Sequence, residues 1–138
     1  MDINEEYDIA KLLRVKLIAP ESIVAKQTFH PKLEVRIAEE YKSLEPQMFN
    51  TLQKKIDWKC YFDIGYRTAS GVEPITETFL RCSYHPELFK GKCISFRLDV
   101  QLPKPGNYVL VARVRTANDA PWENPYIHTR KVEVTKNS

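Results

Sequence analysis

The chain has 138 residues, 43% hydrophobic and 28% charged, which is typical of one globular domain and excludes a disordered or fibrous chain. The net charge of +3 comes from 21 basic and 18 acidic residues that are interleaved along the sequence, so a dedicated nucleic-acid surface is not expected. No stretch approaches the ~20 consecutive apolar residues of a membrane span, and we expect a cytoplasmic protein without membrane insertion.

The first residues of the chain are acidic, and strand-like alternation begins after them. Residues 1–10 carry four acids and are expected to be flexible, which leaves a single domain over 11–136. Alternation of apolar and polar residues predicts strands with one buried face. The inward residues of the first two strands are Leu13, Val15 and Leu17, then Leu33, Val35 and Ile37.

Alternation lapses over residues 39–55. Pro46 suits the first turn of a helix, and apolar residues follow at a spacing of four: Met48, Leu52 and Ile56. This spacing predicts a short amphipathic helical insertion between the second and third strands.

The third strand shows the clearest alternation, with an inner face formed by Trp58, Cys60, Phe62 and Ile64. Residues 68–71 have turn composition, and Gly71 is able to adopt a positive φ angle. The fourth strand is expected over about 75–82. Because both of its faces are polar, we expect it at a sheet edge.

Three further strands complete the pattern. The fifth places alternate residues inward from Ile94 to Leu102, and the sixth does so from Tyr108 to Val114. The last runs over about 127–135, with Val132 and Val134 inward. Seven strands without interleaved helices predict an all-β fold of two antiparallel sheets packed face to face.

Two features resemble the immunoglobulin-like and fibronectin type III-like β-sandwiches. These are Trp58 on the third strand and the Pro-Gly-Asn-Tyr run ending at Tyr108. The resemblance implies that Trp58 lies in the core and that Tyr108 forms a tyrosine corner. Residues 93–114 are also similar to the C-terminal sugar-binding sandwich of O-antigen ABC transporters, which implies a carbohydrate among the candidate ligands.

Motifs for catalysis or metal binding are lacking in the sequence. The three cysteines form no C-x-x-C pair, so free thiols are expected, although a bridge between Cys82 and Cys93 stays open. No histidine has a partner at metal-ligand spacing, and no nucleophile elbow or glycine-rich phosphate loop is present. We therefore expect no metal, no cofactor, no catalytic residues and no enzymatic activity.

The segment 117–126, before the last strand, is the first candidate binding site. Loops at the end of a sandwich often bind ligands because the sheets hold them in place. Two stiff aromatic rings beside polar residues fit either a protein hot spot or a sugar ring. The candidates are Trp122, Glu123, Asn124 and Tyr126. Alternatively, Trp122 folds back as a lid over the open end of the sandwich.

The outward face of the sixth strand is the second candidate, formed by Val109, Val111, Arg113 and Arg115. Two outward valines beside two arginines suggest coverage by the insertion, a second subunit or a partner. The sequence therefore predicts a non-catalytic module for protein–protein interaction, assembly or self-association through this face and the 117–126 loop. The alternative is a carbohydrate-binding module centred on Trp122 and Tyr126.

Overall fold

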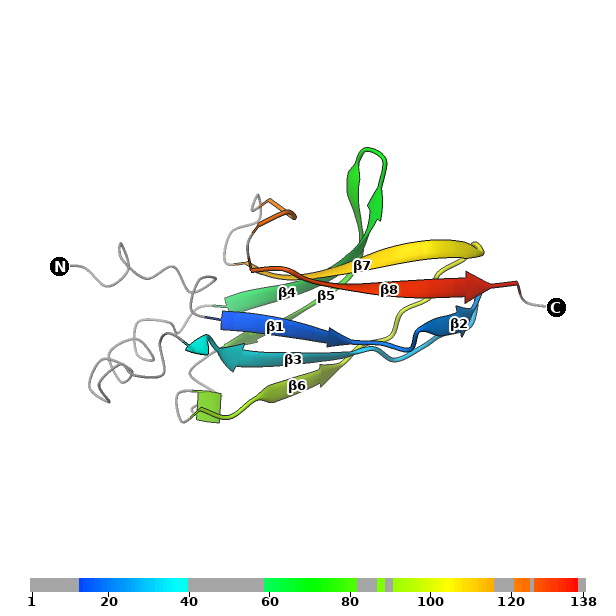
Figure 1. The fold of residues 1–138 in the computed structure, drawn as a ribbon. Helices are drawn as coiled ribbons and strands as arrows, with labels where there is room; N and C mark the ends of the chain where they lie inside the picture. Colours follow the sequence, from blue (N-terminus) through cyan, green and yellow to red (C-terminus); the bar gives the residue numbers. More distant parts are fainter. Residues whose placement is uncertain are drawn as a thin grey trace.

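The computed structural model describes residues 13–39, 59–81, 87–88, 91–115, 121–124 and 126–136. Within these ranges eight β-strands form two sheets that enclose a hydrophobic core (Figure 1), and there is no α-helix. No helix in the described ranges is long and apolar enough to cross a bilayer.

The smaller sheet has three antiparallel strands in the order β1-β3-β6. Their bounds are β1 Leu13–Ile18, β3 Lys32–Ile37 and β6 Ile94–Arg97. Leucine and valine alternate with charged residues along β1 and β3, so every second side chain enters the core. An isolated bridge between Phe29 and Val100 extends the contact between the segments beside β3 and β6.

The larger sheet has five strands in the order β2-β8-β7-β4-β5. The strand bounds are β2 Ser22–Val24, β4 Lys59–Thr68, β5 Gly71–Arg81, β7 Gly106–Arg115 and β8 His128–Thr135. Strand β2 pairs with β8 in parallel, and the other pairs are antiparallel. Strand β5 therefore lies at one edge of this sheet, as its two polar faces predicted.

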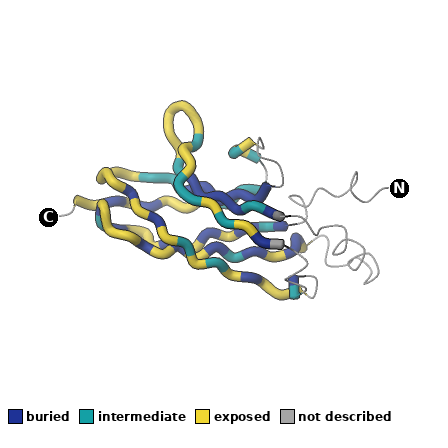
Figure 2. The backbone as a smooth tube through the Cα atoms, turned by 180° about the vertical axis from the view of Figure 1, so that it is seen from behind, coloured by how far each residue is buried: buried dark blue, intermediate teal, exposed yellow. Residues whose placement is uncertain are grey.

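The core lies between the two sheets, where the dark blue stretches of Figure 2 gather. Cys60, Phe62 and Ile64 of β4 are each 0% exposed, which confirms the inner face predicted for the third strand. Leu33 and Val35 of β3 are also 0% exposed. Burial of these side chains gives the two sheets their main mutual attraction.

Strands β4 and β5 form a hairpin that extends past the body of the sandwich (Figure 1). Its tip is exposed in Figure 2. At the tip, the Thr68 hydroxyl donates to the carbonyl oxygen of Gly71 at 3.1 Å. Gly71 has a φ of 136°, a conformation that favours glycine, which confirms the turn predicted there.

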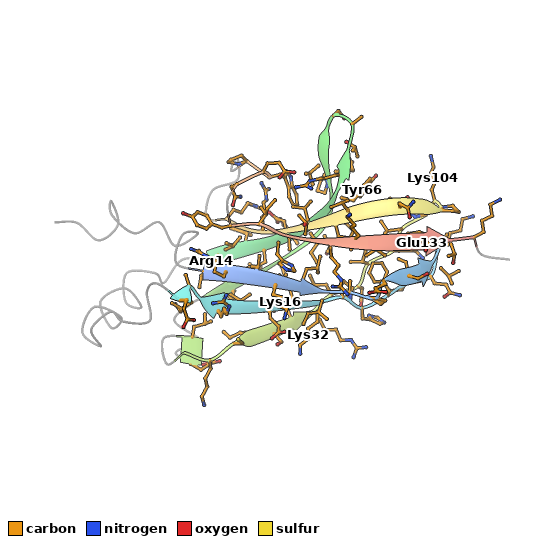
Figure 3. All side chains as sticks on the ribbon, in the orientation of Figure 1. Arg14, Lys16, Lys32, Tyr66, Lys104 and Glu133 are labelled. Carbon is orange, nitrogen blue, oxygen red and sulfur yellow. The ribbon has the colours of Figure 1, made fainter. Side chains whose placement is uncertain are left out.

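Tyr108, near the start of β7, forms the predicted tyrosine corner with the turn that precedes the strand. Its hydroxyl donates to the carbonyl oxygen of Lys104 at 2.8 Å, and its ring meets Tyr66 of β4 edge-on with centroids 5.4 Å apart. Figure 3 labels Lys104 at this turn and Tyr66 on the hairpin. The ring thereby packs on the core while its hydroxyl satisfies a backbone carbonyl.

The prediction of seven strands was wrong, because the described ranges alone contain eight. The missed strand, β2, has only three residues, too few for alternation to reveal. The fourth predicted strand starts earlier than expected, at Gly71, and the fifth ends earlier, at Arg97.

Several predictions fall outside the described residues. These are the flexible N-terminus over 1–10, the position of Trp58, and the helical insertion over 39–55 apart from its first residue. The bridge between Cys82 and Cys93 is likewise untested, because Cys82 lies outside the described ranges. Within those ranges Cys93 is exposed and carries a free thiol.

Candidate functional site

The side of the five-stranded sheet turned away from the core is called the outer face here. Strand register places its side chains in rows that run across three strands. Asp63 of β4 lies opposite Glu77 of β5 and Arg113 of β7. In the next row, Tyr61 lies opposite Phe79 of β5 and Arg115 of β7.

Asp63 holds both arginines of β7. Its Oδ2 atom accepts hydrogen bonds from Nε of Arg113 at 2.7 Å and from Nε of Arg115 at 2.6 Å. All three residues are buried, with exposed fractions of 4%, 6% and 7% for Asp63, Arg113 and Arg115. Glu77, at the edge, accepts from Nη2 of Arg115 at 2.7 Å.

The charges in this cluster compensate one another. The hydrogen bond that Arg115 donates to Asp63 is the main reason that the pKa of Arg115 is raised above its ordinary value, so Arg115 remains a cation. A buried charge is tolerated only when it is paired and hydrogen-bonded. The outer face therefore has a fixed ionic layer of two arginines, Asp63 and Glu77.

Aromatic rings lie on both arginines. The guanidinium carbon of Arg113 is 3.9 Å from the ring centroid of Trp122, and that of Arg115 is 4.6 Å from the Tyr61 ring. Both distances are within the range of cation–π attraction. The Tyr61 ring in turn contacts Phe79 with centroids 6.2 Å apart, and Phe79 is 51% exposed.

Residues 121–124 are held over the outer face by a paired salt bridge. Arg67 donates from Nε and Nη2 to the two carboxylate oxygens of Glu123 at 2.8 and 3.0 Å. This hydrogen bonding raises the pKa of Arg67 and lowers that of Glu123. The loop is further ordered by Asn124, whose Oδ1 accepts the Tyr126 amide at 2.9 Å.

Gly65 makes room for Trp122 on the sheet. A Cβ atom at this position would lie 3.1 Å from Cη2 of Trp122 and 2.6 Å from the carbonyl oxygen of Glu73. A register shift occurs beside Gly65 in the pairing of β4 with β5. The absent side chain therefore lets the indole and the hairpin backbone approach each other closely.

The four candidate loop residues occupy two different places. Trp122 lies against Arg113 of the large sheet, whereas Tyr126 lies against Arg14 of β1, with 4.2 Å from Cζ to the ring centroid. Glu123 is exposed, and Asn124 is half-buried. Trp122 does fold back onto its own domain, but over the outer sheet face and not over the open end of the core.

The four candidates on β7 do lie on the outer face, and most of this face is covered, as the two outward valines suggested. Val111 is 0% exposed, and both arginines are nearly as buried, while Val109 is half-buried. The chain's own Trp122 covers Arg113, and Tyr61 lies against Arg115. The exposed apolar side chain on the outer face is instead Phe79.

Three residues of the outer face were missed from sequence: Asp63, Glu77 and Phe79. The available signal was Asp63, an acid on a strand whose opposite face is wholly apolar, and the sequence alone assigns it no role. Their importance comes from strand register, which brings together side chains far apart in sequence.

The described residues contain no group of three or more potential metal ligands. His30 and Asp99 form an exposed pair at 2.7 Å. His128 instead links the sheets, because its Nδ1 atom accepts the backbone amide of Leu17 at 3.0 Å. Burial, with smaller contributions from Lys16 and Arg130, lowers the pKa of His128 below its ordinary value.

Comparison with known proteins identifies structures with a similar fold. No protein-family model matches the chain, and no curated protein matches it. A crystal structure of a CARDB domain from Pyrococcus furiosus, in complex with di-metal ions, is similar over 91% of this chain and 94% of that one, with 10% identity and a TM-score of 0.58. Its solution structure covers 89% and 94%, with 12% identity and a TM-score of 0.52. The fold is immunoglobulin-like.

The likeness to CARDB domains is one of fold alone at these identities. It supports the predicted immunoglobulin-like β fold of a small domain. It gives no support to the resemblance to the sugar-binding domain of O-antigen transporters. Function therefore has to be argued from the site on this chain.

Proposed function

We propose that this domain is a non-catalytic protein-interaction or assembly module. Its contact surface is the outer face around Phe79 and Tyr61, continued by residues 121–124. The exposure of Phe79, at 51%, is the observation that carries this proposal. A large aromatic side chain kept half in water on a structured face is typical of an interface anchor.

The surroundings of Phe79 fit an interface better than an active site. The buried acid and the buried bases are engaged with one another at 2.6–2.7 Å, which fixes the platform and leaves their charges compensated. An anchor on a rigid platform loses little conformational entropy on binding. The exposed rim carries the Arg67–Glu123 pair, which adds polar contacts around the apolar centre.

The carbohydrate alternative has less structural support. Trp122 and Tyr126 each carry an arginine on one ring face, so at most one face of each ring is left for a sugar. The two rings also lie against different sheets. A glycan panel that leaves the fluorescence of the chain unchanged, in wild type and in Trp122→Phe alike, would remove this alternative.

Quantitative co-purification from the native cell tests the proposal. We expect the Phe79→Ser variant to lose the proteins that wild type retains. The matched control is Ile18→Ser, since Ile18 is the other large exposed hydrophobic residue in the described part of the chain, at 38%, and lies on β1. Equal retention by both variants and wild type would contradict the proposal, provided that circular dichroism shows the same fold.

A further inference from the structure

The interaction surface of Phe79 lies on an edge strand. Strand β5 ends the order β2-β8-β7-β4-β5, and within the described ranges no strand pairs with its second edge. It is also long, with 11 residues. Unpaired edges present backbone donors and acceptors that can bind a further strand, so natural proteins usually block them.

Among the described residues, such a block is found in the first half of β5. Pro74 has no amide hydrogen to donate, and the register shift between Ile64 and Gly65 interrupts the regular ladder nearby. From residue 76 to residue 81 the sequence Thr-Glu-Thr-Phe-Leu-Arg contains neither proline nor glycine, and pairing with β4 is regular. The second half of β5 is thus competent to accept another strand.

We infer that the second half of β5 pairs with β5 of a second copy of this chain, antiparallel, about a two-fold axis at Phe79. This inference rests on the proposed interaction surface and names its partner. In such a pairing residue 79 faces itself, residue 78 faces residue 80, and residue 77 faces residue 81. The two five-stranded sheets then become one continuous sheet.

Aromatic side chains match across this axis. Within one copy, Arg115, Tyr61 and Phe79 lie next to one another in a row across three strands, and their side chains are in contact. Phe79 is the last residue of this row, at the edge of the sheet. The two-fold operation continues it with Phe79 and Tyr61 of the second copy. Cross-strand aromatic pairs are among the stabilising contacts of sheets, and the exposed Phe79 ring leaves water.

Charges match as well. The neighbouring row consists of Arg113, Asp63 and Glu77, and Glu77 lies at the sheet edge. The side chain of Glu77 is 60% exposed. On the other side of Phe79, backbone register pairs residue 59 with residue 81 at the edge, and residue 81 is an arginine in the sequence. The two-fold axis places Glu77 of one copy opposite Arg81 of the other, so opposite charges meet on both sides of the aromatic pair.

The interface formed by these few residue pairs is small. Interfaces below about 1,200 Å² of total buried area are generally weak and reversible. We therefore expect a dimer that forms as the concentration rises. In sedimentation equilibrium, wild type should pass from monomer to dimer, and Phe79→Ser should remain monomeric. The Ile18→Ser variant should dimerise like wild type.

Disulfide trapping tests the register. In a Cys82→Ser, Cys93→Ser background that keeps Phe79, the Glu77→Cys, Arg81→Cys double variant should form a covalent dimer under oxidised glutathione, since residue 77 of one copy faces residue 81 of the other. Glu77→Cys alone is the matched control, and it should cross-link far more slowly because its partner position then carries no thiol. The fold of each variant is checked by circular dichroism.

The outcomes separate this inference from the proposed function. A concentration-dependent dimer lost in Phe79→Ser, with preferential trapping in the Glu77→Cys, Arg81→Cys double variant, supports the two-fold pairing. A wild-type chain that stays monomeric at its highest attainable concentration, or equal trapping in the double variant and in Glu77→Cys alone, overturns it. If the chain is monomeric and Phe79→Ser still loses a different cellular protein, the inference fails while the proposed function stands.

Discussion

The indole ring of Trp122 lies on the guanidinium group of Arg113, with 3.9 Å between the ring centroid and Cζ. Arg113 is at the same time hydrogen-bonded to the buried Asp63. One loop residue thus covers the charged layer of the outer face, and the salt bridge between Arg67 and Glu123 keeps the loop in place. The proposed contact surface is therefore ordered by contacts within its own chain.

Replacing Trp122 with Ala removes this cover. We expect a loss of about 1–2 kcal/mol in the free energy of unfolding, because a desolvated cation–π contact is worth roughly that much. Urea unfolding followed by circular dichroism measures it. The Trp122→Phe variant keeps an aromatic ring and should lose less. An unchanged midpoint for Trp122→Ala would show that the indole does not stabilise the domain.

Asp63 is the residue of the ionic layer whose loss should cost most. The Asp63→Asn variant removes the one buried carboxylate that Arg113 and Arg115 share, and removing one partner of a buried ion pair typically costs about 3–5 kcal/mol. The control is Glu77→Gln, because Glu77 is 60% exposed and an exposed pair contributes about 1 kcal/mol or less. Equal effects of the two variants on urea stability would argue against a buried layer.

A substitution at Gly65 tests the close approach of Trp122 to the hairpin. We expect Gly65→Ala to destabilise the domain by about 1–3 kcal/mol, the usual cost of overpacking. The added Cβ would sit 2.6 Å from the backbone oxygen of Glu73 and 2.7 Å from Cγ1 of Val72. Adding Val72→Ala should relieve only part of the loss, since the backbone oxygen remains. A fully stable Gly65→Ala variant in thermal unfolding would exclude this packing.

His128 makes stability depend on pH. Its pKa in the folded protein is lowered from the ordinary 6.5, mainly by burial, so the unfolded chain binds a proton first as the pH falls. This contribution is therefore present above about pH 6.5 and is lost as the pH drops toward the lowered folded pKa. The His128→Gln variant should show a flatter stability profile between these values, and an identical profile would contradict the assignment.

How much the sequence predicts depends on whether a feature is local. The alternation of Leu13, Val15 and Leu17 with charged residues indicates which side chains of this strand are buried, because successive side chains point to opposite faces. The strand was found where the sequence predicted it. The tyrosine corner at Tyr108 is likewise a matter of a few consecutive residues. Strand β2 was missed because three residues are too few to show a period.

The outer face could not be predicted because it depends on pairing. Arg113 and Arg115 were recognised as unusual outward residues, but the partner that neutralises them, Asp63, lies about 50 positions earlier in the chain. A single sequence gives no register between β4 and β7. For the same reason Phe79 was assigned to a polar edge strand, and its exposure beside Tyr61 was found only in the structure.

Site-specific photo-cross-linking in the native cell tests the central claim most directly. Benzoylphenylalanine replaces Phe79 in one variant and Ile18 in another, so both probes sit at exposed apolar positions of the same domain. We predict that irradiation joins the probe at position 79 to another protein chain, whether a second copy or a different partner, and that the probe at position 18 stays largely unreacted. Cross-linking at position 18 alone, or at neither position, would contradict an interaction surface on the outer face.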